Sequence, residues 1–260
     1  MDSANLRIET RGPAVLITID RAKMLNALDP VTLQELTAAV QDLASKPGLV
    51  GVVIQGAGEK AFVAGADIAA MAHMGPLEAQ RHSETGHALV KALRSSPLVS
   101  VAAVKGYALG GGLELALACD FRIASEDAQF GAPEVGLGVI PGFGGTQLLP
   151  RLLGEARAKE LLLTGDRIDA SRALSLGMVH RVVPKDRVLD ESLALVARIA
   201  KNGPLAVRVA KDVAQQGLEL PLEHGLALEA RAFGTVFASR DQKEGMKAFL
   251  EKRPPRYEGC

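Results

Sequence analysis

The chain has 260 residues, 48% of them hydrophobic, which is enough to bury one large core or a main domain with a small appendage. Its 30 Lys and Arg residues balance 30 Asp and Glu residues, so no net charge is available to hold nucleic acid or an anionic membrane surface. Two cysteines form no disulfide framework, and the N-terminus has no signal or membrane-span pattern, so we expect a soluble cytoplasmic protein.

The predicted elements alternate between strands and helices over the first part of the chain, which indicates an α/β protein. In chain order they are strands at 6–10 and 14–20, a helix at 29–46, a strand at 49–56, a helix near 76–95, a strand at 98–106, a helix after Gly112 and a strand at 120–125. Asp29 is the expected N-cap of the first helix, with Pro30 in its first position.

The pattern becomes mainly helical from about Gly154, with one short strand expected at 178–184. We therefore divide the chain into a main region at 1–200 and a helical region at 201–260. The apolar faces of helices in such a region need a covering surface, either on the main domain or on another subunit.

Three segments combine small residues with a nearby acid: "AFVAGADI" at 61–68, "GYALGGGLE" at 106–114 and "APEVGLGVIPGFGGTQLLPRLLG" at 132–154. One glycine-rich turn alone is more often only a tight connection between a strand and a helix. Glu114, however, lies in the first turn of a helix that is otherwise Leu and Ala. Burying a carboxylate there is costly or raises its pKa, which favours a chemical use.

The familiar glycine-rich and catalytic signatures are absent. No segment has the G-x-G-x-x-G, Gly-Lys-Ser/Thr, G-x-S-x-G or HExxH pattern, and no Cys/His cluster has metal-ligand spacing. A helix start offers unpaired N–H groups, so Gly111 and the "AGAD" loop could together hold an oxyanion. Glu114 and Glu134 would then be candidates for moving protons beside that oxyanion.

These segments together resemble the crotonase superfamily and, within it, the enoyl-CoA hydratase/isomerase family. The resemblance covers nearly the whole chain and also includes "NALD" at 26–29 and "EGMKAFLEKRPP" at 244–255. It implies a crotonase-type spiral of β-β-α turns, with residues 1–200 as the catalytic core. Residues 201–260 would form a C-terminal helical region used in trimer packing, giving a homo-oligomer that is a trimer or a dimer of trimers.

The resemblance assigns site residues through their positions in the matching motifs. Ala66 and Gly111 match the two N–H donors for the thioester oxygen, and Glu114 and Glu134 match the two catalytic glutamates of the family's hydratases. The substrate-binding and CoA-binding residues that it implies are Ala64, Ala66, Asp67, Ile68, Gly111, Gly142, Phe249 and Lys252, the last two reaching the CoA of a neighbouring subunit. It implies no metal and no cofactor, because coenzyme A is part of the substrate.

The implied activity is syn addition of water to a 2-trans-enoyl-CoA, as in fatty-acid β-oxidation. Isomerisation of an enoyl-CoA, or hydration of a branched or carboxylated enoyl-CoA in amino-acid breakdown, stays open as an alternative. An idle scaffold or an RNA-binding relative is disfavoured by the neutral charge and the two acids. Met71 and Met74 lie in a segment that would either line the acyl pocket or only pack between helices, and Cys119 is expected to be a buried packing residue.

Overall fold

The computed structural model describes residues 3–259 of the chain. Contacts within the chain divide it into two units, one that ends at Ala194 and one that begins at Leu195. The division falls within helix α8 (Val188–Ile199). Among residues 3–259, no helix is both long enough and apolar enough to cross a membrane.

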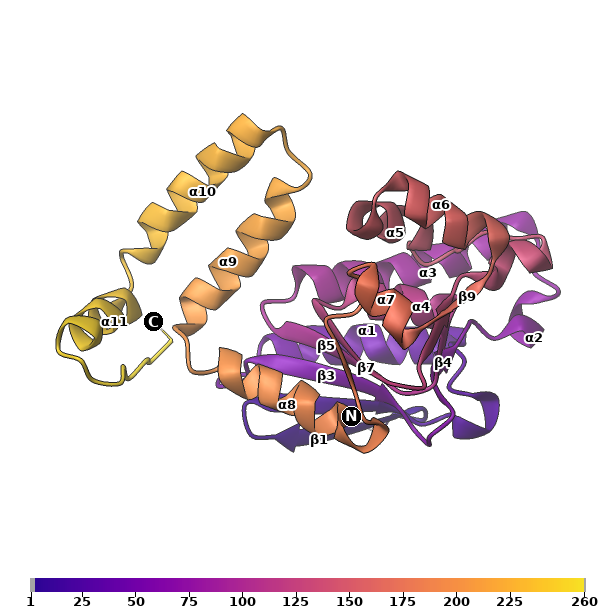
Figure 1. The fold of residues 1–260 in the computed structure, drawn as a ribbon, viewed down its shortest axis with the longest axis horizontal. Helices are drawn as coiled ribbons and strands as arrows, with labels where there is room; N and C mark the ends of the chain where they lie inside the picture. Colours follow the sequence, from indigo (N-terminus) through magenta and orange to yellow (C-terminus); the bar gives the residue numbers. More distant parts are fainter. Residues whose placement is uncertain (1–2, 260) are drawn as a thin grey trace. The chain divides into compact units, whose positions relative to one another are not determined.

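The first unit contains a six-stranded sheet (Figure 1). Its strands in spatial order are β1 (Leu6–Arg11), β2 (Ala14–Ile19), β3 (Gly51–Gly56), β5 (Val99–Val104), β7 (Phe121–Ser125) and β10 (Arg181–Val183). β1 and β2 form an antiparallel hairpin, and the other neighbours are parallel. Every residue of β2 and β5 is buried, as is typical of parallel strands covered on both faces. The strands expected from the sequence are confirmed.

A second sheet of four short strands lies in the same unit. Its strands in spatial order are β4 (Ala61–Ala64), β6 (Tyr107–Leu109), β8 (Gln129–Gly131) and β9 (Arg167–Asp169). β4, β6 and β8 pair in parallel, and β9 pairs with β8 in the antiparallel direction. The sequence pattern did not predict these strands individually, because three or four residues are too few to show an alternation of buried and exposed side chains.

Consecutive strands alternate between the two sheets. β3, β5 and β7 belong to the first sheet, and each is followed by a strand of the second sheet, β4, β6 or β8, and then by a helix. The chain thus repeats a β-β-α turn and advances along both sheets at once. Because β4 and β6 end side by side, the segments that follow them, which contain Ala66 and Gly111, also lie close together.

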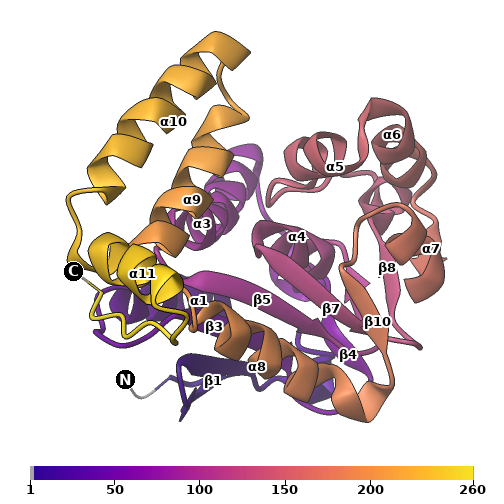
Figure 2. The same cartoon turned by 60° about the vertical axis from the view of Figure 1, so that its left-hand side comes forward.

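Helices cover the sheets of the first unit. They are α1 (Pro30–Ala44), α2 (Ile68–Met71), α3 (Pro76–Ser95), α4 (Gly111–Ala118), α5 (Gly145–Leu153), α6 (Glu155–Thr164) and α7 (Ala170–Ser175), with 3-10 turns η1 (Ala22–Met24), η2 (Pro133–Leu137) and η3 (Lys185–Arg187). The predicted cap of α1 is confirmed, because the Asp29 carboxylate accepts the Thr32 N–H at 2.7 Å. α4 is buried along its whole length and packs against strands of both sheets (Figure 2).

The second unit is helical. It contains the end of α8, α9 (Pro204–Gly217), α10 (Leu222–Val236) and α11 (Arg240–Leu250), and α9 and α10 lie side by side as a hairpin (Figures 1 and 2). Many large apolar side chains of this unit are exposed in the single chain, among them Leu218, Leu222, Phe233, Phe249 and Leu250. Apolar surface of this extent is typical of a face that another protein surface covers.

Candidate active site

The start of α4 is built from three consecutive glycines. Gly110 has φ +50° and ψ −123°, a conformation that side chains other than hydrogen disfavour. At Gly112, an added Cβ would lie 2.0 Å from the Val63 carbonyl oxygen of β4. The glycines therefore allow the helix to begin in close contact with the second sheet, where a longer side chain would separate the two.

Two backbone N–H groups meet at this helix start. A Cβ placed on Gly111 would lie 3.4 Å from the Ala66 nitrogen. On either side of Ala66, the Leu28 N–H donates to Gly65 at 2.9 Å and the Asp67 N–H donates to Leu28 at 3.0 Å, so the Ala66 N–H points away from Leu28. Within residues 3–259, neither the Ala66 nor the Gly111 N–H donates a hydrogen bond. Such a pair of free donors suits an oxygen that gains negative charge.

A charged cluster holds the loop that carries Ala66. The Arg21 guanidinium lies 3.0 Å from the Asp29 carboxylate and 3.3 Å from the Asp67 carboxylate, and the three side chains are 15–20% exposed. Arg21 also donates to the Ala27 carbonyl, and Asp67 caps α2 by accepting the Ala70 N–H at 3.3 Å. Asp67 therefore orders its loop. The part played by Arg21 was missed, because 46 residues separate it from Asp67 and no local pattern joins them.

Glu114 is buried, and no cationic side chain of residues 3–259 pairs with it. Only 3% of its surface is exposed, and its Oε1 accepts the N–H groups of Phe143 at 2.8 Å and Gly145 at 2.7 Å. Burial raises the pKa of Glu114 to about 7, against the effect of the Gly145 and Phe143 N–H groups and with a further increase from the nearby charge of Glu134. This carboxyl group can therefore gain or lose a proton near neutral pH.

Glu134 lies in η2 and faces the same helix start. Its Oε1 is 2.9 Å from the position that a Cβ on Gly110 would occupy, and its Oε2 is buried with no hydrogen-bond partner among the described residues. Burial raises the pKa of Glu134. A buried carboxyl oxygen that no protein group satisfies is costly, so this oxygen points to a missing partner such as a substrate or a water.

The remaining predicted residues fall into two groups. Ala64 and Ile68 flank the Ala66 loop, and the Gly142 carbonyl, next to Phe143, accepts a hydrogen bond from Ser83 at 2.5 Å. The structure thus brings Ala64, Ala66, Asp67, Ile68, Gly111, Glu114, Glu134 and Gly142 to one region of the first unit. Phe249 and Lys252 belong to the second unit, where Phe249 is 83% exposed.

Other residues singled out in the sequence have simpler surroundings. Cys119 is buried, as expected for a packing residue. Met71 and Met74 are half-buried, which leaves both of their predicted roles open. His82, which the sequence did not single out, is buried on α3 with its ring 5.2 Å from that of Phe143.

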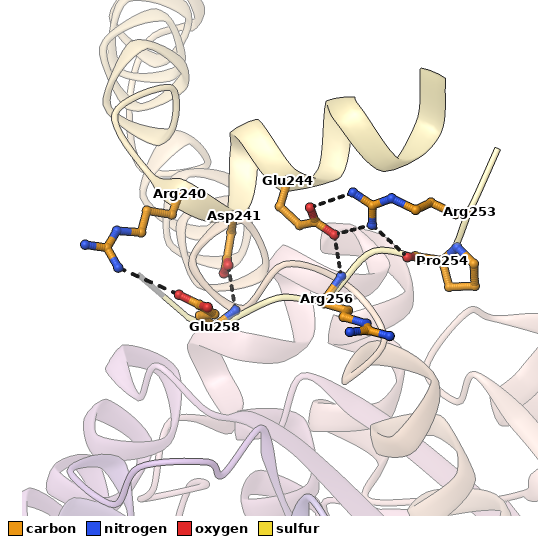
Figure 3. Close-up of a pocket in the computed structure, with 7 residues that line it drawn as sticks. All are labelled: Arg240, Asp241, Glu244, Arg253, Pro254, Arg256 and Glu258. Carbon is orange, nitrogen blue, oxygen red and sulfur yellow. Dashed lines mark hydrogen bonds and ion pairs between the residues drawn. The ribbon is translucent and has the colours of Figure 1, made fainter. Parts of the chain in front are cut away.

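A separate cavity of about 820 Å³ lies in the second unit (Figure 3). It is lined by Arg240, Asp241, Glu244, Arg253, Pro254, Arg256 and Glu258. Arg253 binds the Glu244 carboxylate through two hydrogen bonds of 2.6 and 2.9 Å, so the acids and bases of this cavity largely satisfy one another. None of the predicted site residues lines it.

Comparisons with known proteins agree with the geometry of the first unit. The family model described as enoyl-CoA hydratase/isomerase matches residues 9–260. A crotonyl-CoA hydratase of Syntrophomonas wolfei is 45% identical over 249 residues, 96% of each chain. A short-chain-enoyl-CoA hydratase of Clostridium acetobutylicum is 42% identical over 253 residues, 97% of each chain.

Solved structures of this family have the same fold. An enoyl-CoA hydratase from Bacillus anthracis superposes with a TM-score of 0.95 at 40% identity, covering 98% of this chain and 100% of that chain. A Geobacillus kaustophilus structure also gives 0.95 at 41% identity, covering 100% of both chains. The predicted crotonase-type fold with a C-terminal helical region is therefore confirmed. The chain belongs to the enoyl-CoA hydratase/isomerase family.

Proposed function

We propose that this enzyme is an enoyl-CoA hydratase that adds water syn across the double bond of a 2-trans-enoyl-CoA to give a 3-hydroxyacyl-CoA. One observation carries the proposal: two acids with raised pKa values face a helix start that also presents two free N–H donors. The relatives named crotonyl-CoA hydratase and short-chain-enoyl-CoA hydratase support the same reaction class, a hydro-lyase.

The N–H groups of Ala66 and Gly111 bind the thioester oxygen. When water attacks the β-carbon, electron density moves through the conjugated system onto this oxygen, which becomes an enolate. Two donors fixed in advance stabilise the enolate more than the neutral thioester, and this difference lowers the barrier. The positive end of the α4 dipole acts in the same direction.

Glu114 and Glu134 divide the proton transfers between them. Because the Glu114 Oε1 is occupied by two N–H donors, its other oxygen is the one that receives the proton of the attacking water. Glu134 supplies the proton to the α-carbon through its unsatisfied oxygen. Two carboxyl groups that share one water titrate as a pair, which helps to keep one of them protonated near neutral pH.

The substrate is an acyl-CoA thioester, and no further cofactor takes part. Ala64, Asp67 and Ile68 would contact coenzyme A beside the oxyanion donors, and Gly142 would contact the acyl part. Phe249 and Lys252 would reach the CoA of a neighbouring subunit in a trimer or a dimer of trimers, in which the exposed apolar side chains of the second unit are covered. We place the enzyme in the cytoplasm and in fatty-acid β-oxidation.

The alternative is an isomerase that moves a double bond, or a hydratase of branched or carboxylated enoyl-CoA. Moving a proton between two carbons needs one acid, so the second acid favours hydration. The deciding experiment gives the purified chain crotonyl-CoA and, separately, a 3-enoyl-CoA. We expect the absorbance of the conjugated thioester to fall with crotonyl-CoA. An increase of that absorbance with the 3-enoyl-CoA and no change with crotonyl-CoA would establish an isomerase instead.

A further inference from the structure

The loop that leads to the two N–H donors of Glu114 has a glycine on each side of Phe143. It runs through Pro141, Gly142, Phe143 and Gly144, and Gly144 has φ +109°. Glycine-rich backbone of this kind is flexible unless other groups hold it. The orientation of the Glu114 carboxyl depends on this loop, because one of its two protein donors is the Phe143 N–H and the other is the N–H of Gly145, the first residue of α5 directly after the loop.

A side chain of α3 binds this loop at the critical peptide group. The Ser83 hydroxyl donates to the Gly142 carbonyl oxygen at 2.5 Å, across 59 positions of sequence. The Gly142 carbonyl and the Phe143 N–H belong to the same peptide group, and that N–H donates to Glu114 Oε1 at 2.8 Å. The hydroxyl, the peptide group and the carboxylate therefore form one continuous chain of hydrogen bonds.

We propose that Ser83 is a positioning residue for Glu114, which fixes and polarises the Gly142–Phe143 peptide so that its N–H holds the carboxylate in place. Accepting a hydrogen bond at the carbonyl makes the N–H of the same peptide a stronger donor, since linked hydrogen bonds strengthen one another. This inference rests on the proposed function, in which Glu114 receives the proton of water.

The surface of α3 is shaped to receive this loop. Gly86, one turn after Ser83 and on the same face of the helix, lies against the Phe143 ring so closely that an added Cβ would be 2.0 Å from Phe143 Cδ1. The His82 ring meets the same phenyl ring edge-on. Side chain and backbone of Phe143 are thus held by one helix, and this fixes the direction of its N–H.

Few titratable groups surround this chain of hydrogen bonds. Glu134 acts on Glu114 through its charge, and His87 Nε2 lies 3.4 Å from the Ser83 hydroxyl. Burial lowers the pKa of His82, which is the third such group. Within this set, Glu114, whose pKa burial raises to about 7, changes its charge near neutral pH.

The test compares Ser83→Ala with the wild-type chain in crotonyl-CoA hydration across pH. We expect kcat to fall about 3- to 10-fold with a smaller change in KM, because Ser83 reaches the substrate only through the loop that it holds. The Phe143 N–H lowers the pKa of Glu114, so weakening it raises that pKa and moves the acidic limb of kcat/KM to higher pH. The expected move is a few tenths of a pH unit, since polarisation alters linked hydrogen bonds by about 10–30%.

Two further variants separate positioning from a merely structural effect. Ser83→Thr keeps the hydroxyl and should restore most of kcat and the position of the acidic limb. Ser95→Ala removes an exposed hydroxyl of the same helix that, among residues 3–259, bonds only to the Lys91 carbonyl, at 2.8 Å. This variant should change neither kcat nor the position of the acidic limb. Each variant is first compared with the wild type in melting temperature and in assembly.

Three outcomes would overturn the proposal. Ser83→Ala could leave kcat and the pH profile unchanged, it could lower kcat without moving the acidic limb, or it could raise KM alone, which would make Ser83 a substrate contact. If the wild-type chain hydrates no crotonyl-CoA, the proposed function itself fails, and that result is recognised before any variant is made.

Discussion

Replacing Glu114 with Gln should stabilise the protein while removing its activity. The amide is nearly the same shape as the carboxyl, and its oxygen can accept the N–H groups of Phe143 and Gly145 as Glu114 Oε1 does. The pKa of Glu114 rises from 4.5 to about 7 on folding, chiefly because of burial. At about 1.4 kcal/mol for each pKa unit, ionising this group costs the folded protein about 3 kcal/mol.

The sign of this effect sets its pH dependence. Because the folded state holds the Glu114 proton more tightly than the unfolded state, the wild-type protein loses stability as the pH rises from 4.5 through about 7. Glutamine has no proton to lose. The stability advantage of Glu114→Gln should therefore be small near pH 4.5 and reach about 3 kcal/mol above pH 7, as an upper value that relaxation of the site will reduce.

Denaturant unfolding at pH 5 and pH 8, at one fixed protein concentration, measures this difference. Glu160→Gln is the matched control, because the Glu160 side chain lies exposed on α6 and its replacement should have no comparable pH-dependent effect. A gain in the free energy of unfolding of Glu114→Gln that is equal at both pH values would refute the reasoning, since it would mean that folding does not raise the pKa of Glu114.

The other predictions concern turnover and assembly. Glu114→Gln and Glu134→Gln should each lower kcat for crotonyl-CoA hydration at least 10²-fold, and the double variant should be little worse than the poorer single variant. Normal hydration by Glu114→Gln beside an inactive Glu134→Gln would contradict the two-acid mechanism. Gly111→Pro removes one proposed oxyanion donor and should lower kcat by about 10²- to 10³-fold, and near-normal turnover of the folded variant would exclude that role. Light scattering should show a trimer or hexamer, and a monomer at working concentration would contradict the proposed assembly.

Elements with a strong local signal could be predicted from the sequence. The β1–β2 hairpin has a turn of Gly12 and Pro13 between two apolar runs, and α1 has Asp29 and Pro30 at its start. The second sheet could not be predicted in this way, because its strands are three or four residues long and are specified by the strands beside them. The β-β-α order that places them was available only through the resemblance to a family.

The residues of the site also divide into those with a local signal in the sequence and those without one. Glu114 drew attention because a carboxylate among Leu and Ala is locally inconsistent, and such inconsistencies concentrate at functional sites. Arg21 and Ser83 gave no such signal. An arginine after a strand and a serine in a polar helix are ordinary, and their partners lie 46 and 59 positions away. Only the folded structure shows that Arg21 holds the loop of Ala66 and that Ser83 holds the loop that binds Glu114.

Arg21 and Ser83 explain how so small a set of reacting groups can be held in place. The proposed chemistry uses two backbone N–H groups and two carboxyl groups, and all four lie in the three segments of small residues at 61–68, 106–114 and 132–154. Glycine permits the close approach of β4 and α4, but it leaves the backbone free to move. The ion pairs of Arg21 and the hydrogen bond of Ser83 act from outside these segments and restrict that motion. The glycines therefore allow the close approach of the two donor segments, and the residues around them provide the fixed geometry that the proposed stabilisation of a transition state requires.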